Sequence, residues 1–226
     1  MPWRLTPMVP GERSGVRLVL RPLLRRWMRL VVHDAEQVPS SGPVLIASTH
    51  QSHADSLALA VAIERPVYFL GDLKLTSVPV FGPMLPKLGM VPLRRGEADA
   101  SALDVVGALL DMDGCVAVYP EGSRSRDGRV HRLRSGVARL AAHHQVTVVP
   151  ASVVGIDRVW PIDARPRVTG GPVTVTFGAP FDPPEDTPRS RRAFNDALQK
   201  TLADLAGTEM AADYSAFHGG DAAGGQ

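Results

Sequence analysis

Short apolar runs alternate with helical patterns along most of the chain, and this alternation limits the fold more than any other feature of the sequence. Several runs are apolar at consecutive positions and rich in β-branched residues, as in strands of a parallel sheet that helices cover on both faces. The expected strands are residues 44–48, 67–71, 115–119, 146–154 and 173–177. The expected helices are residues 54–64, 100–111, 136–144 and 190–205. The sequence therefore predicts an α/β fold with a mostly parallel central sheet covered by helices.

Chain length and composition indicate one domain with appendages. A chain of 226 residues with 44% hydrophobic residues can build one sizeable core, but it is short for two separate domains of the usual size. We expect this domain at residues 34–206, preceded by a flexible leader at residues 1–14 and a helix at residues 15–33. The Gly/Ala-rich tail, residues 207–226, is expected to be disordered.

Cysteine content and apolar run lengths favour the cytoplasm as the working compartment. Cys115 is the single cysteine, so the chain has no internal disulfide. No apolar stretch long enough for a signal peptide follows the N-terminal charges. The longest apolar run, residues 57–63, is far shorter than the roughly 18 residues that a membrane-spanning helix needs. We therefore expect a protein that does not cross a bilayer.

The segment at residues 15–33 has the pattern of a basic amphipathic helix. Its apolar residues recur at helical spacing: Val16, Val19, Leu20, Leu23, Leu24, Trp27, Met28 and Val31. Arginines occupy every fourth position: Arg13, Arg17, Arg21, Arg25 and Arg29. Pro22 lies inside the pattern, so two short helices fit it as well as one. The segment is either an ordinary surface helix packed on the core or a helix in a membrane interface, with its arginines on lipid phosphates.

A histidine and an aspartate follow the strand at residues 44–48. Ser52 and Asp55 have the spacing of a capping box, which places the start of the next helix at Ser52 and His50 just before it. His50 could fold back, donate Nδ1–H to Asp55 and leave Nε2 free to accept a proton from a substrate hydroxyl. The simpler alternatives are that Asp55 only caps the helix and that His50 is a loop histidine. His53 is expected to face solvent on the first turn.

A second polar cluster, Tyr119-Pro120-Glu121-Gly122-Ser123-Arg124-Ser125-Arg126-Asp127-Gly128, directly follows another strand. That position is the carboxyl edge of the sheet, where open α/β sheets bind ligands. Arginines beside glycine and small hydroxyls suit an anion such as phosphate, because guanidinium donors match phosphate oxygens in a fork. Glu121 would orient an arginine or contact glycerol hydroxyls. The alternative is a charged surface turn.

Two further stretches are uninformative by themselves. The run from Gly89 to Arg95 indicates only a strand with a basic end, and the run around Val149 and Pro150 indicates a buried strand with a structural role.

Taken together, the four stretches resemble the lysophosphatidate-type glycerolipid acyltransferases, whose commonest members are bacterial 1-acylglycerol-3-phosphate acyltransferases. The blocks stand in the family's order and at similar separations: His-x4-Asp at His50 and Asp55, Gly-x5-Arg at Gly89 and Arg95, Glu-Gly-Thr-Arg at residues 121–124, and Val-Pro at Val149 and Pro150. The resemblance covers roughly residues 44–180, and the arginine helix corresponds to the family's membrane-contacting N-terminal helices. It implies a glycerol-3-phosphate acyltransferase-like fold.

The resemblance also implies a reaction. His50 and Asp55 would catalyse transfer of a fatty acyl group from acyl-CoA or an acyl carrier protein to the free hydroxyl of lysophosphatidate, giving phosphatidate. The acceptor would be bound by Arg95, Glu121, Gly122, Ser123 and Arg124. The thioester is a cosubstrate, and neither a metal nor a bound cofactor is implied. The expected location is peripheral, on the anionic cytoplasmic face of the cell membrane.

Three positions depart from the family pattern. Thr49 stands where Asn is frequent, Ser123 replaces Thr, and Arg94 occupies a position that is commonly acidic. The choice between Arg94 and Arg95 as the main phosphate contact stays open, and another lipid or glycosylated alcohol remains an alternative acceptor.

Other classes of protein fit the sequence less well. A serine hydrolase needs a nucleophile elbow, and Gly-x-Ser-x-Gly does not occur. A metal hydrolase could use His50, His53 and Asp55, but the chain lacks an HExxH pattern. A basic module that binds anionic lipid or nucleic acid would explain the arginine helix, yet the chain carries no nucleic-acid motif and such a module would not need the two polar clusters.

Overall fold

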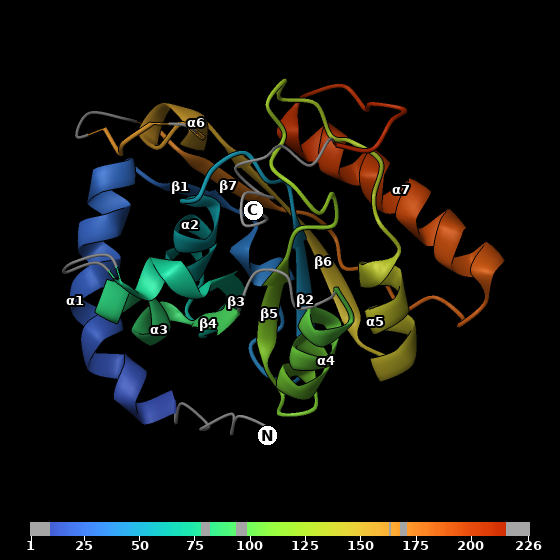
Figure 1. The fold of residues 1–226 in the computed structure, drawn as a ribbon, viewed down its shortest axis with the longest axis horizontal. Helices are drawn as coiled ribbons and strands as arrows, with labels where there is room; N and C mark the ends of the chain where they lie inside the picture. The colour runs from blue at the N-terminus through green and yellow to red at the C-terminus, as the bar shows by residue number, and fades with distance from the viewer. Residues whose placement is uncertain (1–9, 78–81, 94–98, 163, 168–170, 216–226) are drawn as a thin grey trace, which may run out of the picture.

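The central feature of the computed structural model is one twisted sheet, which runs through the middle of the molecule (Figure 1). The structure describes residues 10–77, 82–93, 99–162, 164–167 and 171–215. In these residues the sheet has seven strands in the order β1-β7-β6-β2-β5-β3-β4. The strands are β1 (Val31–His33), β2 (Val44–Ser48), β3 (Val67–Asp72), β4 (Met90–Leu93), β5 (Cys115–Val118), β6 (Thr147–Val154) and β7 (Thr174–Phe177). Neighbouring strands are parallel except for the antiparallel pair of β6 and β7.

Helices cover both faces of the sheet, as the sequence predicts. The helices are α1 (Pro10–Met28), α2 (Asp55–Ala62), α3 (Leu85–Leu88), α4 (Asp99–Leu110), α5 (Gly136–His144), α6 (Ile156–Val159) and α7 (Pro188–Ala206). Short 3₁₀ turns are η1 (Ala35–Gln37), η2 (Leu73–Ser77) and η3 (Gly82–Met84). Figure 1 shows α1, α2 and α3 on one side of the sheet and α4, α5 and α7 on the other.

Strand β2 shows how the apolar runs build two cores. All five of its residues are buried. Val44 and Ile46 face the core beneath α2, whereas Leu45 and Ala47 face the core beneath α4, α5 and α7. Successive side chains of a strand point to opposite faces, so a strand between two helix layers must be apolar throughout. The prediction of a mostly parallel, covered sheet is confirmed.

The N-terminal segment differs from its prediction in its bounds. Helix α1 is continuous through Pro22 and begins at Pro10, so residues 10–14 are helical and not part of a leader. Residues 1–9 lie outside the described part of the chain. The helix ends at Met28 because Arg29 is left-handed (φ 48°), and Val31–His33 forms the edge strand β1, paired with β7. The valines continue the helical period locally, but the free edge of β7 offers their backbone groups hydrogen-bond partners.

Two arginines of α1 contact the neighbouring helix α2. Arg21 Nε donates to Val61 O (3.2 Å), and Arg25 Nη1 donates to the same oxygen (3.1 Å). Arg21 Nη1 lies 2.6 Å from Glu64 Oε1. Both arginines therefore hold the C-terminal end of α2, whose last carbonyls lack helical partners. The outward side of α1 carries the exposed Leu18, Val19, Leu23 and Arg26, and Arg29 is exposed directly after the helix.

The first residues of the expected disordered tail are ordered by the loop after β5. Gly207 ends α7 at a φ of 62°. Val130 N then donates to Glu209 O (3.0 Å), and Ala211 N donates to Val130 O (2.9 Å). Ala211 is buried as a result. The prediction of disorder is wrong for residues 207–215, because composition does not reveal these distant backbone partners, and residues 216–226 lie outside the described part of the chain.

Candidate active site

The two polar clusters meet at the carboxyl edge of the sheet because β2 and β5 are neighbouring parallel strands. The loop after β2 carries His50, and the loop after β5 carries residues 121–124. Ser125 N donates to His50 O (2.7 Å), which joins the two loops directly. On the other side of β2, Thr49 Oγ1 accepts from Val153 N (3.1 Å) in β6. His50 is thus fixed between three strands of the sheet.

The predicted contact between His50 and Asp55 is present. His50 Nδ1 lies 2.8 Å from Asp55 Oδ2, and this oxygen also accepts from the backbone N–H groups of Gln51 and Ser52, each at 2.8 Å. The Asp55 side chain is fully buried, so the carboxylate acts as an acceptor that sets the ring's tautomer with Nδ1 protonated. His50 Nε2 can then accept a proton, and the ring is 19% exposed.

Helix α2 begins at Asp55 and not at Ser52 as predicted. Ser52 Oγ accepts from Ala54 N (3.1 Å), so it closes a turn ahead of the helix. The shift places the Asp55 carboxylate in the first turn, where the helix dipole favours negative charge. Asp55 therefore accepts hydrogen bonds both from the turn and from the histidine. It acts as a cap and as the partner of His50, so these two interpretations are compatible.

Tyr119 provides a contact that the sequence did not reveal. Its ring stacks on that of His50, with centroids 3.8 Å apart and an interplanar angle of 15°. Its hydroxyl lies 2.6 Å from Ser56 Oγ, the residue after Asp55. Burial, with a further contribution from the charge of Asp55, raises the pKa of the Tyr119 phenol well above its usual value, so the ring stays neutral. The only signal in the sequence was an aromatic residue directly before Pro120.

Arg124 lies beside the histidine loop. Arg124 Nη1 is 2.7 Å from His53 Nε2, and because a guanidinium only donates, Nε2 must be the accepting nitrogen. His53 is exposed, as expected, whereas Arg124 is 8% exposed and Ser123 5% exposed. Ser123 Oγ is buried without a hydrogen-bond partner among the described residues. These residues do not form the solvated surface turn that was the alternative.

Gly122 has a left-handed backbone conformation, with a φ of 79°. Glycine adopts this conformation without the strain that another residue would have. A Cβ at this position would also lie 2.4 Å from Arg134 Nε, so a larger residue would require the Arg134 side chain to move. The glycine thus allows the loop to turn sharply and bring Ser123 and Arg124 toward His50.

Glu121 lies inside the protein, which disagrees with the expected contact to acceptor hydroxyls. The residue is 1% exposed, and Oε2 accepts from His131 N (3.0 Å). Burial raises the pKa of this carboxyl to about 7, although backbone hydrogen bonds from His131 and His50 oppose the change. Glu121 therefore holds the two loops together from within, and its burial argues against direct binding of a substrate.

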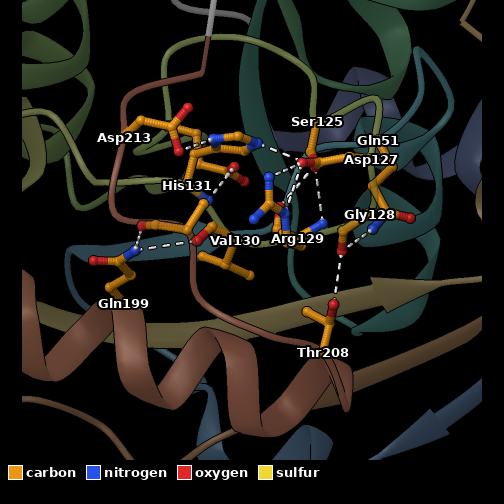
Figure 2. Close-up of polar contacts among 12 residues, drawn as sticks. Gln51, Ser125, Asp127, Gly128, Arg129, Val130, His131, Gln199, Thr208 and Asp213 are labelled. Atoms are coloured by element: carbon orange, nitrogen blue, oxygen red, sulfur yellow. Dashed lines mark hydrogen bonds and ion pairs between the residues drawn. The ribbon is translucent and has the colours of Figure 1, made fainter.

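Residues both near and distant in sequence brace the rest of this loop (Figure 2). Asp127 Oδ2 accepts from Arg129 Nε (2.8 Å), and Asp127 Oδ1 lies 3.1 Å from His131 Nε2. Burial alone would raise the pKa of the Asp127 carboxyl, but these bonds hold it well below its usual range. Gly128 O accepts from Thr208 Oγ1 (3.0 Å), so the segment after α7 supports the loop from outside.

The remaining predicted positions are less informative. Arg94 and Arg95 lie outside the described residues, so their placement relative to Arg124 stays a prediction. Val149 and Pro150 lie in the buried part of β6, which agrees with a structural role. Among the described residues, no three His, Cys, Asp or Glu side chains are close enough to hold a metal ion. Nor does any helix in the described ranges have the length and apolar character to cross a membrane.

Comparison with known proteins identifies the family. A family model described as Acyltransferase matches residues 29–154, more than half of the chain, and all four sequence blocks fall inside this range. The chain belongs to this acyltransferase family. The resemblance inferred from the four blocks is thus confirmed, and the His50–Asp55 pair lies within the family's domain.

Two plant acyltransferases are similar in sequence. A chloroplastic 1-acyl-sn-glycerol-3-phosphate acyltransferase of Arabidopsis thaliana is 28% identical over 158 residues, which cover 69% of this chain and 44% of that protein. A chloroplastic protein of the same description from Brassica napus is 29% identical over 153 residues, covering 66% and 44%. The chain thus spans less than half the length of either relative.

A solved structure has the same fold. The crystal structure of PlsC, the 1-acyl-sn-glycerophosphate acyltransferase from Thermotoga maritima, matches with a TM-score of 0.62 over 85% of this chain and 82% of that chain. The identity is 21%, so this match establishes the fold of the acyltransferase family for the present chain.

Proposed function

We propose that the chain transfers a fatty acyl group from a thioester to the free hydroxyl of 1-acylglycerol-3-phosphate, giving phosphatidate. The observation that carries this proposal is the His50–Asp55 pair, held 2.8 Å apart beside Arg124 at the carboxyl edge of an acyltransferase fold. The names of the plant relatives support lysophosphatidate as the acceptor.

In the proposed mechanism His50 is a general base. Nε2 accepts the proton of the acceptor hydroxyl as its oxygen attacks the thioester carbonyl, and Asp55 stabilises the imidazolium that forms. The tetrahedral oxyanion then collapses, the carbon–sulfur bond breaks, and the leaving thiolate receives the proton from His50. The acyl group passes directly to the acceptor, so no acyl-enzyme forms.

The acceptor phosphate is assigned to Arg124 and Arg95, with Gly122 and Ser123 beside it. Arg124 supports this role because its guanidinium is largely buried and already oriented by His53. A phosphate would compete with His53 for the same donors, and charge-assisted bonds to phosphate are the stronger. The unpaired Ser123 Oγ offers one further group.

The donor is acyl-CoA or an acyl carrier protein thioester, and no cofactor takes part. We place the protein at the cytoplasmic face of the membrane as a peripheral protein. The outward Leu18, Val19 and Leu23 of α1 would enter the anionic interface, with Arg26 and Arg29 near lipid phosphates. A module that only binds anionic lipid would not need His50 and Asp55.

Acceptor selectivity tests the proposal. Initial rates are measured with lysophosphatidate and with the matching monoacylglycerol, which lacks the phosphate. Wild type should prefer lysophosphatidate strongly, and Arg124→Ala should narrow this preference by raising the acceptor KM, because each charge-assisted hydrogen bond is worth about 1.5–3 kcal/mol. The control is Arg139→Ala, an exposed arginine of α5. Equal use of both acceptors by wild type would move the assignment to a neutral or glycosylated alcohol.

A further inference from the structure

A hollow of about 670 Å³ adjoins the proposed reaction centre. Gln51 and Ser125 line it on one side, and these residues directly follow His50 and Arg124 in sequence. The bond from Ser125 N to His50 O ties this wall to the catalytic loop. Figure 2 shows Gln51, Asp127 and Gly128 together at this wall, with Gln51 Nε2 3.4 Å from Gly128 O. A ligand in the hollow would therefore lie next to the loop that carries the general base.

The opposite wall is held in place by two tryptophans. Its lining residues are Asp157, Arg158, Pro161, Ile162, Ala164 and Arg167. Trp160 Nε1 donates to Ala164 O (3.0 Å), and Trp27 Nε1 of α1 donates to Arg167 O (3.0 Å). Arg167 N donates to Val159 O (2.8 Å). These bonds fix the backbone at Arg167 relative to α6, so the wall does not depend on the ligand for its shape.

The charge on the hollow favours an anion. Arg126, Arg158 and Arg167 line it together with Asp127 and Asp157. The charge of Asp127 is already engaged, since its carboxylate accepts from Arg129 Nη2 at 2.7 Å and Nε at 2.8 Å. Positive charge therefore remains in excess. Arginine donors match phosphate oxygens well, so a phosphate-bearing ligand fits best.

Size and polarity distinguish the two substrates that carry phosphate. Lysophosphatidate has a long hydrocarbon chain close to its phosphate and needs a continuous apolar wall, whereas among the described residues the apolar side chains Pro161, Ile162 and Ala164 line the hollow on the side of α6 alone. Its volume is also much larger than one phosphate needs, and lies within the range of about 300–1,000 Å³ that is usual for small-molecule sites. A long polar arm with a phosphate at its end matches both features.

We propose that this hollow binds the phosphopantetheine arm of the acyl donor, with Arg158 and Arg167 on its phosphate. The inference rests on the proposed function, because it assumes a thioester donor that delivers its carbonyl to His50. Coenzyme A and acyl carrier protein share this arm, so the site serves either source. The acceptor would then approach His50 from the side of Arg124.

Kinetics with full and truncated donors test the assignment. The same fatty acyl group is supplied on coenzyme A, on acyl carrier protein and on pantetheine, which lacks the phosphate. The double variant Arg158→Gln/Arg167→Gln should raise the KM of both phosphate-bearing donors at least about tenfold, the loss expected when charge-assisted contacts are removed. The KM for acyl-pantetheine and for lysophosphatidate should stay within twofold. The donor with the lower KM in wild type identifies the natural source.

A matched control and two other outcomes make the test decisive. Arg165→Gln removes a nearby exposed arginine that does not line the hollow, and it should leave every KM unchanged. An equal rise in KM for acyl-coenzyme A and acyl-pantetheine would overturn the assignment. A rise in the KM of lysophosphatidate alone would overturn it too, since the hollow would then belong to the acceptor.

Binding measured without turnover separates this inference from the proposed function. Coenzyme A, 4′-phosphopantetheine and pantetheine are each titrated into wild type and the double variant by calorimetry. Wild type should bind the first two at least about tenfold more tightly than pantetheine, and the double variant should lose that difference. If wild type transferred no acyl group yet showed this pattern of affinities, the proposed function would be wrong, but the phosphopantetheine-binding site would be supported. Equal affinity for phosphopantetheine and pantetheine would reject the site.

Discussion

At the scale of residues, the His50 ring is held on two sides by neighbouring residues of α2. Asp55 contacts its edge directly, and Ser56 acts on its face through the Tyr119 hydroxyl. The first turn of α2 therefore determines where Nε2 points, and Tyr119 is a positioning residue in the proposed reaction.

Substitutions at Tyr119 test this positioning. Tyr119→Leu should lower kcat about tenfold with little change in either KM, because it removes the stacked face but no substrate contact. Tyr119→Phe and Ser56→Ala should each lower kcat by less than Tyr119→Leu does, and by similar amounts. The double variant Tyr119→Phe/Ser56→Ala should lower kcat no more than either single variant, since both substitutions remove the same hydrogen bond. Additive losses in this cycle, or a loss only in KM, would contradict the role, and thermal unfolding would identify variants that simply fold badly.

Glu121 makes stability depend on pH. Because burial raises its pKa from 4.5 to about 7, the folded state binds a proton more tightly than the unfolded state. The resulting stability is fully present below about pH 4.5 and is lost as pH rises through about 7.

Glu121→Gln should therefore flatten this dependence, since glutamine stays neutral and its carbonyl can still accept from His131 N. Between pH 5 and pH 8, wild type should lose more free energy of unfolding than the variant, by at most about 3 kcal/mol. Urea unfolding at the two pH values measures the difference. Parallel pH curves for the two proteins would show that the carboxyl is ionised in the folded protein.

The contact between His50 and Asp55 could be predicted from sequence because it is local, five residues apart beside a strand end. The stack of Tyr119 on His50 could not, since it depends on β2 and β5 being neighbours in the sheet. Nor could the burial of Glu121, whose partner His131 is presented by a loop that the segment after α7 braces. Local patterns reveal which groups could react, whereas the fold determines which of them reach a substrate.

At the scale of elements, α1 has two different faces. Its inward face packs Leu20, Leu24 and Trp27 against the core and directs Arg21 and Arg25 at the end of α2. Its outward face carries exposed leucines and Arg26, and the exposed Arg29 directly follows. Helical periodicity alone did not distinguish the inward arginines from the outward ones, and it predicted one basic amphipathic helix. Deleting the helix would also remove the fully buried Met28, so paired substitutions test it more cleanly.

The two pairs of arginines should have opposite effects. Arg21→Gln/Arg25→Gln should lower the free energy of unfolding by about 1–3 kcal/mol, because carbonyls at the end of α2 lose charged donors. Binding to anionic vesicles should change little. Arg26→Gln/Arg29→Gln should leave stability unchanged and weaken vesicle binding by about 1 kcal/mol per arginine.

Thermal or urea unfolding and vesicle co-sedimentation, applied to both pairs, measure these effects. Loss of vesicle binding in the inward pair, with no loss in the outward pair, would show that α1 meets the membrane by a different face.

At the scale of the whole molecule, the fold places the residues proposed for catalysis and acceptor binding at one edge of the sheet. The loops that carry His50 and Arg124 meet there because their strands are parallel neighbours. Alternating strands and helices predicted this class of fold correctly. The strand order and the antiparallel β7 could not be predicted, because they depend on pairings between distant segments. The short edge strand β1 was missed for the same reason, since its three residues form a strand only beside β7.

Acyl transfer by His50 is tested most directly by following a labelled acyl group from its thioester into phosphatidate. Wild type should form labelled phosphatidate from lysophosphatidate. His50→Ala should form it about 10²- to 10⁴-fold more slowly while folding normally, and Asp55→Asn should lose less. His143→Ala, an exposed histidine of α5, and Cys115→Ser should both stay active. Activity near wild type in His50→Ala, or an inactive Cys115→Ser, would contradict a general-base mechanism without an acyl-enzyme.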